Sequence, residues 1–174
     1  ENWITAGKIA AEVREWSKQL IKPGARLLDI ANAIEAKIRE KGAVPGFPVN
    51  LSLNETAAHY TPVLEDSLIL SDQILKVDIG VSYNGAIGDT AYTVDLSGKR
   101  TKLVEASQQA LANVTKMLKV GVTLGEIGKV VEDTIQSYGF QPIRNLSGHG
   151  IALYSIHTAP SIPNYNTGDK TALQ

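Results

Sequence analysis

Residues 77–90 read VDIGVSYNGAIGDT, and this stretch decides how the rest of the chain is interpreted. Asn84-Gly85 lies between two β-prone arms, which is a strong signal for a two-residue type I′ hairpin because both turn positions need positive φ. In such a hairpin Tyr83 pairs with Ala86, so that paired residue numbers add to 83 + 86 = 169. The sequence therefore predicts a hairpin of two long strands with a fixed register.

This register places two carboxylates on one face of the hairpin. Asp78 faces Ala91, and Asp89 lies on the same face as the diagonal neighbour of Asp78, at a Cα separation of roughly 7–8 Å. An apolar opposite face is expected from four side chains: Val77, Ile79, Val81 and Ile87. One alternative is that one aspartate caps a turn and the other is solvent-exposed. Two anions on a sheet face are costly unless they share a cation, which favours a cation site.

The histidines add a second type of metal ligand. Carboxylates together with imidazole suit Mn, Fe, Co or Zn, and two such ions about 3.5–4 Å apart can activate one water molecule. His149 lies between Gly148 and Gly150, which we interpret as clearing space around a ligand imidazole, although a hydrogen-bonded loop histidine is the alternative. Taken alone, His157 and His59 are more typical of structural histidines. The sequence has no phosphate-binding glycine loop and no Gly-x-Ser-x-Gly elbow, which disfavours serine acyl transfer.

Composition narrows the class of protein. The chain has 174 residues, 43% of them hydrophobic, so it can bury a sizeable core. Its 17 basic and 18 acidic residues give a net charge of -1, which disfavours a nucleic-acid partner. It has no cysteine, no apolar run of membrane-spanning length and no signal peptide pattern at its start. We therefore predict a cytoplasmic protein that binds neither membrane nor nucleic acid.

Apolar periodicity and breaker residues predict the remaining elements. Helices are expected at 2–21, 27–41, 99–119 and 124–138, an edge strand at 47–53, the hairpin at 74–82 and 86–96, and further strands at 140–147 and 151–157.

This order of elements repeats along the chain. Lys22-Pro23-Gly24 corresponds to Lys119-Val120-Gly121 at a displacement of 97, and Asn50-Leu51-Ser52 to Asn145-Leu146-Ser147 at a displacement of 95. Chance likeness of helix-turn-helix-strand units is the alternative to a duplication. The repeat predicts half-domains at about 1–97 and 98–174. It also places the counterpart of Asp78 at 173 or 175, so the second half is expected to lack its hairpin.

Three segments together resemble a known family: GFPVNLSLNETAAHYTP (46–62), LKVDIGVSYNGAIGDTAYTVDL (75–96) and NLSGHGIALYSIHTAPSIPNY (145–165). They resemble the methionine aminopeptidases of the pita-bread metallopeptidase family, and AAHYTP looks like the type II branch of archaea and eukaryotes. The resemblance implies an α+β fold with a pseudo-twofold repeat, in which helix pairs flank a central antiparallel sheet. It also implies a single catalytic domain over 1–174 whose second half is incomplete.

The resemblance assigns roles to the metal ligands. Asp78 would ligate one metal ion through both carboxylate oxygens, Asp89 would bridge two ions, and His149 would ligate the second. The two ions would be divalent Co, Mn, Fe or Zn. The family completes this site with two glutamates whose counterparts would follow Gln174, so we expect weak metal binding and little or no turnover by this chain alone.

The resemblance also implies a substrate site. His157 and His59 would hold the peptide carbonyl and stabilise the tetrahedral intermediate, while Phe47, His59 and Ile156 would border a pocket for the methionine side chain. The implied reaction is hydrolysis of the initiator methionine from nascent proteins by a water molecule that the metal ions activate. A prolidase-like dipeptidase and a non-catalytic pita-bread binding scaffold remain alternatives. A sheet edge left uncovered by the incomplete half is expected to favour self-association.

Overall fold

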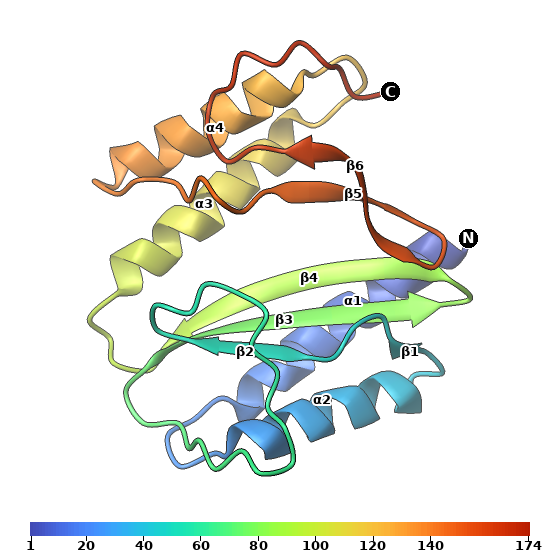
Figure 1. Cartoon of the computed structure of the whole chain (residues 1–174), viewed down its shortest axis with the longest axis vertical. Coiled ribbons are helices and arrows are strands. Elements are labelled where there is room, and N and C mark those ends of the chain that lie inside the picture. The colour runs from blue at the N-terminus through green and yellow to red at the C-terminus, as the bar shows by residue number, and fades with distance from the viewer. The chain divides into compact units, whose positions relative to one another are not determined.

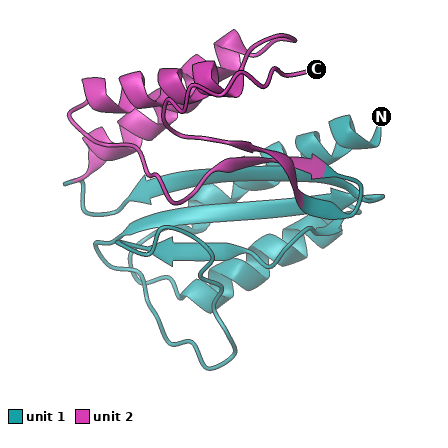
Figure 2. Ribbon diagram, turned by 45° about the horizontal axis from the view of Figure 1, so that its top comes forward, with its two compact units in different colours: residues 1–99, 152–156 teal, residues 100–151, 157–174 magenta.

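The computed structural model describes all residues from 1 to 174, and the chain divides into two compact units (Figure 2). The first unit contains Glu1–Lys99 and Ala152–Ile156, and the second contains Arg100–Ile151 and His157–Gln174. Each unit is described by itself below.

The first unit is an antiparallel sheet with two helices on one face (Figure 1). In the sheet, β3 pairs with β4 along one edge and with both β1 and β2 along the other. The elements are α1 (Asn2–Ser17), the short 3-10 helix η1 (Lys18–Leu20), α2 (Leu27–Glu40), β1 (Val44–Pro45), β2 (Asn50–Leu53), β3 (Ile74–Tyr83) and β4 (Ala86–Asp95). The strand expected at 47–53 is confirmed as the edge strand β2, shortened because Pro48 cannot donate to a strand ladder.

The hairpin has the predicted register and turn. Asn84 and Gly85 have φ values of 50° and 83°, as a type I′ turn requires. Tyr83 pairs with Ala86 and Asp78 with Ala91. The helix-facing positions of β3 are fully buried in the main core, where apolar area removed from water stabilises the fold by about 25 cal/mol per Å²; they are Leu75, Val77, Ile79 and Val81.

One residue of the hairpin was assigned to the wrong face. Ile87 pairs with Ser82, and Ser82 alternates with Gly80 and Asp78, so Ile87 lies on the aspartate face rather than opposite to it. The aspartate face is therefore less polar near the turn than the sequence interpretation required.

The second unit is built on α3 (Thr101–Met117) and α4 (Leu124–Ser137). These helices pack over small apolar clusters, one of which contains Ala106, Ala110 and Ile135. Thr123 and Glu126 form a capping box that begins α4, because each side chain bonds the backbone N–H of the other residue.

Strands β5 (Gly148–Ala152) and β6 (Ser155–Ile162) pair as a two-stranded sheet. The strand expected at 140–147 is wrong, since β5 begins only at Gly148. The carbonyl of Leu146 accepts a hydrogen bond from the Asn164 side chain, a loop contact in place of a strand partner. The strand expected at 151–157 is divided by a turn at Leu153-Tyr154.

Backbone contacts at the start of α2 recur at the start of α4. In each unit, a segment far along the chain makes three hydrogen bonds with the residues that lead into the helix. The donor–acceptor pairs are Gly24–Leu70, Leu27–Leu68 and Leu70–Ala25 in the first unit, and Gly121–Leu173, Leu124–Thr171 and Leu173–Val122 in the second. The two sets share one pattern of donors and acceptors, and the half-repeat itself stays a prediction.

The same contacts correct the numbering of the repeat. Gly24 and Gly121 differ by 121 − 24 = 97, but Leu70 and Leu173 differ by 173 − 70 = 103. Residue 173 is therefore the counterpart of Leu70, and the expectation that 173 or 175 matches Asp78 is wrong.

Candidate metal and substrate site

Two predicted ligands and one predicted pocket residue meet on one face of the first unit. Asp78 comes from β3 and Asp89 from β4, where Asp89 pairs with Gly80. A Cβ added at Gly80 would overlap the ring of Phe47, so this ring lies directly over the glycine. Asp78 is partly buried and Asp89 is exposed. The missing side chain at Gly80 thus lets an aromatic ring approach the sheet at a position that neighbours both carboxylates.

Polar side chains of β2 hold the segment that carries His59. Asn50 pairs with Asp78, and its Nδ2 donates to the Thr61 hydroxyl at 2.9 Å. The Ser52 hydroxyl accepts from the backbone N–H of Tyr60 at 3.2 Å. Asn50 and Ser52 share the face of Asp78 by strand alternation, so these bonds anchor the segment around His59 beside the aspartate face. His59 itself is exposed.

The sequence analysis missed Asn50, Ser52 and a third residue, Lys76. Lys76 lies two positions before Asp78 on the same face, and its Nζ donates to the carbonyl of Asn54 at 2.6 Å. Partial burial lowers the pKa of Lys76, while the nearby charge of Glu55 acts in the opposite direction. Alternating polar residues in the predicted edge strand, and a lysine two residues from an aspartate, were the signals available for all three.

The two histidines of the second unit lie together. The rings of His149 and His157 are 4.3 Å apart at their centroids, with an angle of 68° between their planes. His149 Nδ1 is 3.1 Å from the carbonyl oxygen of Gly150. Because a carbonyl oxygen only accepts, this bond assigns the proton to Nδ1 and the lone pair to Nε2, the tautomer in which an imidazole ligates a metal through Nε2.

The glycines around His149 have a different role from the predicted one. A Cβ at Gly150 would overlap the carbonyl oxygen of Ala159, and a Cβ at Gly148 would lie 3.2 Å from Ile162 Cβ. Both neighbours belong to β6, so the glycines allow β6 to approach β5 closely. The interpretation that they clear space for the imidazole is wrong.

The remaining predicted residue is Ile156, which is partly buried and belongs to the segment Ala152–Ile156 of the first unit. The structure therefore brings Asp78, Asp89 and Phe47 together in the first unit, and His149 and His157 together in the second. No group of three or more histidine, aspartate or glutamate side chains is arranged to hold a metal ion. The predicted metal-site and substrate-site side chains thus lie in two pairs, Asp78 with Asp89 in the first unit and His149 with His157 in the second.

Comparison with known proteins gives these pairs a context. Residues 1–174 match the family described as "Metallopeptidase family M24". This chain belongs to that family. A methionine aminopeptidase of Methanocaldococcus jannaschii is 50% identical over 165 residues, which are 94% of this chain and 56% of that protein.

Solved structures agree with this M24 assignment. The crystal structure of methionine aminopeptidase from Thermotoga maritima is 29% identical with a TM-score of 0.91, and the match covers 99% of this chain and 74% of that chain. The prolidase from Pyrococcus furiosus is 23% identical with a TM-score of 0.81 over 99% of this chain and 52% of that chain, a likeness of fold alone.

These findings confirm the pita-bread fold and the resemblance to archaeal-type methionine aminopeptidases. Membership of the M24 family implies metal ions. The chain spans 56% of the length of the Methanocaldococcus jannaschii protein and 60% of that of the methionine aminopeptidase of Thermococcus onnurineus.

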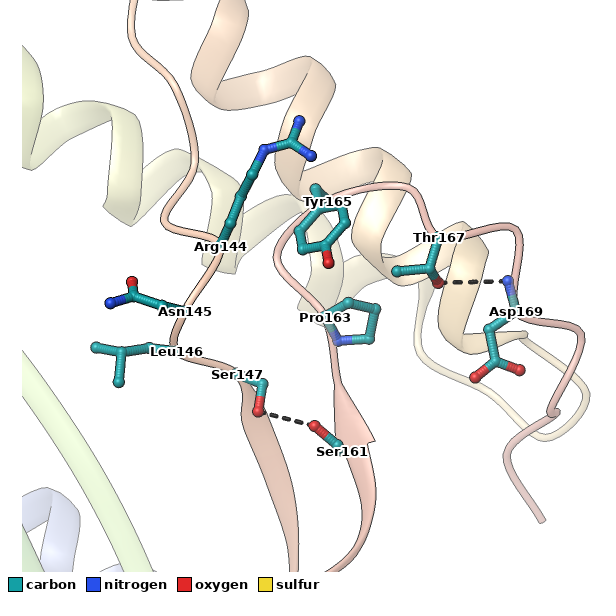
Figure 3. A pocket seen from close by; sticks show the side chains of 9 residues that line it. All are labelled: Arg144, Asn145, Leu146, Ser147, Ser161, Pro163, Tyr165, Thr167 and Asp169. Carbon is teal, nitrogen blue, oxygen red and sulfur yellow. Dashed lines mark hydrogen bonds between the residues drawn. The ribbon is translucent and has the colours of Figure 1, made fainter.

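The second unit of this M24 chain also has an open groove of about 560 Å³ (Figure 3). On its walls the Arg144 guanidinium lies 4.4 Å from the Tyr165 ring centroid, and the Ser161 hydroxyl donates to the Ser147 hydroxyl at 2.8 Å. No predicted site residue lines it. Leu146, on its wall, is 37% exposed.

No helix of the chain is both long enough and apolar enough to cross a membrane.

Proposed function

We propose that this chain supplies part of the active site of a metal-dependent aminopeptidase that hydrolyses the initiator methionine from nascent proteins in the cytoplasm. The observation that carries the proposal is the aspartate face. In an M24 chain, Asp78 and Asp89 are diagonal neighbours on the sheet, and the Phe47 ring lies over Gly80, which neighbours both of them.

Two divalent cations, drawn from Co, Mn, Fe and Zn, would be held by Asp78, Asp89 and His149. Carboxylate oxygens and the Nε2 of His149 are donors that these ions accept, so the chemistry of the three donors suits the ions. When bound, the ions would lower the pKa of a water molecule and supply a nucleophile at neutral pH. Three protein ligands are few for two ions, so weak binding and little turnover are expected of this chain alone.

The substrate would be a peptide with an N-terminal methionine. Phe47, His59 and Ile156 would border the side-chain pocket, where an apolar ring suits a long, polarisable thioether. His59 and His157 would hold the first peptide carbonyl, because an imidazole N–H aimed at that oxygen stabilises the negative charge that develops during hydrolysis.

Calorimetric titration of the 174-residue chain with Mn²⁺ or Co²⁺ tests the metal site. We expect weak, saturable binding that Asp78→Asn and Asp89→Asn each reduce by about tenfold or more. Asp133→Asn, which removes an exposed carboxylate from α4, is the matched control and should leave binding unchanged. Equal binding by all three variants, or no binding by the parent chain, would contradict the ligand assignment.

Activity on two peptides tests the reaction. Methionine release from Met-Ala-Ser should be slight and should exceed cleavage of Ala-Pro. Fast turnover would show that Asp78, Asp89 and His149 are sufficient as protein ligands for catalysis. Preference for Ala-Pro would support a prolidase-like dipeptidase, and metal-free peptide binding without cleavage would support a scaffold.

We also propose that the chain self-associates through the second unit. Leu103 and Leu111 of α3 are 38% and 64% exposed, whereas Ala6 of α1, the repeat counterpart of Leu103, is fully buried. Exposed leucines along one helix favour burial against another chain. Sedimentation velocity should show mass increasing with protein concentration, and a monomer at every concentration would contradict this proposal.

A further inference from the structure

The turn between β5 and β6 makes an unusual contact. Tyr154 has a φ of 56°, in the left-handed region that bulky residues rarely adopt. Its backbone N–H donates to the carbonyl oxygen of Gly85 at 2.8 Å. Neither the β3–β4 hairpin nor the β5–β6 hairpin needs this bond for its own ladder, so the bond joins one turn to the other.

The side chain of Tyr154 makes the same connection. A Cβ built on Gly85 would lie 2.5, 2.6 and 2.8 Å from Cε2, Cζ and Cδ2 of the Tyr154 ring. Gly85 is buried although it stands at the tip of a hairpin, while Tyr154 is 81% exposed. The ring therefore covers the glycine and contributes little to any apolar core.

The segment that carries this contact lies between two proposed functional residues. Residues Ala152–Ile156 belong to the first unit, as does Gly85. His149 precedes this segment in β5 and His157 follows it directly in β6. On the other strand pair, Gly85 is joined to Asp89 and Asp78 by the continuous β3–β4 ladder.

We propose that Tyr154 is a positioning residue, which latches the β5–β6 turn onto the β3–β4 turn and thereby fixes the strand ends next to His149 and His157. Its catalytic meaning rests on the proposed function, because His149 is the proposed metal ligand and His157 the proposed carbonyl-binding residue. The latch has two parts, the N–H of residue 154 and the ring over Gly85.

Substitutions separate the contribution of the Tyr154 ring from that of its backbone hydrogen bond. Tyr154→Gly removes the ring, keeps the N–H and accepts a positive φ without strain. Tyr154→Phe keeps the ring. Gly85→Ala places a methyl group against the ring and also strains the turn, because Gly85 has a φ of 83°. The double variant Gly85→Ala with Tyr154→Gly keeps the strain but removes the clash, so it separates the two effects.

Two readouts of the 174-residue chain are measured for each variant: Mn²⁺ affinity by calorimetry and the hydrogen exchange rate of the residue 154 amide. If loss of the latch leaves about one molecule in five in the arrangement that binds Mn²⁺, the apparent Mn²⁺ affinity falls about fivefold. We expect this loss in Tyr154→Gly and Gly85→Ala, and parental affinity in Tyr154→Phe. The loss of Mn²⁺ affinity in the double variant should be smaller than the two single losses combined.

Stability distinguishes positioning from a purely structural role. Because Tyr154→Gly relieves a left-handed tyrosine, its urea midpoint should equal or exceed that of the parent even as Mn²⁺ affinity falls. Parental affinity together with unchanged exchange at residue 154 in Tyr154→Gly and Gly85→Ala would overturn the latch.

The exchange measurement keeps the two proposals separate. If the parent chain binds no Mn²⁺, the proposed metal site fails, but a protected residue 154 amide that Gly85→Ala exposes would still establish the latch. If the parent binds Mn²⁺ and residue 154 exchanges freely, the metal site stands and the latch is wrong.

Discussion

Replacing Gly88 by alanine should destabilise the first unit by about 1–3 kcal/mol, the usual cost of an added methyl group in a closely packed core. Gly88 lies on the helix-facing side of β4. A Cβ there would lie 2.6 Å from the carbonyl oxygen of Ala6, 2.9 Å from its carbonyl carbon and 3.0 Å from Ala10 Cβ. The first two are backbone atoms of α1 and cannot rotate away, so α1 has to move off the sheet.

Tryptophan fluorescence during urea unfolding measures this cost. The chain has two tryptophans, Trp3 and Trp16, and both stand in α1, so the signal reports on the helix that the substitution displaces. With an m-value of about 1.5 kcal/mol per M, a loss of about 1–3 kcal/mol lowers the urea midpoint by roughly 1–2 M.

Gly7→Ala is the matched control because it is the same substitution in α1, the helix that Gly88 of β4 contacts. A Cβ at Gly7 meets no atom within 4 Å. Alanine inside an exposed helix is favoured over glycine by about 0.5–1 kcal/mol, so the midpoint should rise. The opposite signs are the test. A Gly88→Ala midpoint at or above that of the parent would refute the described packing of α1 on β4.

Three further outcomes are expected. Burial raises the pKa of Tyr92 to about 12, against the opposing effect of its bond to Ser17. The protonated phenol therefore stabilises the fold below about pH 10, and this contribution is lost as the pH rises through 12. Alkaline absorbance titration should show a late ionisation that Tyr92→Phe removes, and a late ionisation that remains in Tyr92→Phe would contradict the assignment. Thr123→Ala should cost about 1 kcal/mol of helix stability. It should also raise the lowered pKa of Glu126 part of the way to its ordinary value, since the bond from the backbone N–H of residue 123 remains. An unchanged NMR titration of Glu126 would count against the capping box. Native-state hydrogen exchange should be faster in α3 and α4 than in β3, because the second unit's clusters are much smaller than the first unit's core; equal protection would be the contrary result.

The hairpin was predictable because its determinants are local. Positive φ at Asn84 and Gly85 fixes the turn, the turn fixes the register, and the register fixes which side chains share a face. The error at Ile87 follows from the same rule, since a single step along a strand reverses the face of a side chain.

The strand expected at 140–147 failed for a non-local reason. Asn50-Leu51-Ser52 and Asn145-Leu146-Ser147 are identical, yet the first tripeptide is strand and the second is not. The first is a strand because β3 supplies hydrogen-bond partners along its length. Strand formation depends on the partner as well as on the sequence, so an identical tripeptide without such a partner takes a different backbone.

The candidate site also has features that depend on local sequence and features that depend on distant contacts. Residue type and spacing predicted that Asp78 and Asp89 share a face of the hairpin, which the strand register confirms, whereas the roles of these residues and of the histidines stay predictions. The roles of Asn50 and Ser52 could not be inferred, because they depend on bonds to Thr61 and Tyr60 in a loop whose path the sequence leaves open. The Phe47 ring over Gly80 belongs to the same class of contact.

The core and the proposed site of the first unit are two faces of one strand. Asp78 stands between Val77 and Ile79, both fully buried against the helices. Moving the Asp78 backbone would withdraw these side chains from a close-packed core, so the core holds the carboxylate in place. The same holds for Asp89, whose neighbour Gly88 packs against α1 with no room for a methyl group. The separation of the two carboxylates is therefore set by packing on the face opposite to them, which provides the preorganisation that a metal site requires before any ion binds.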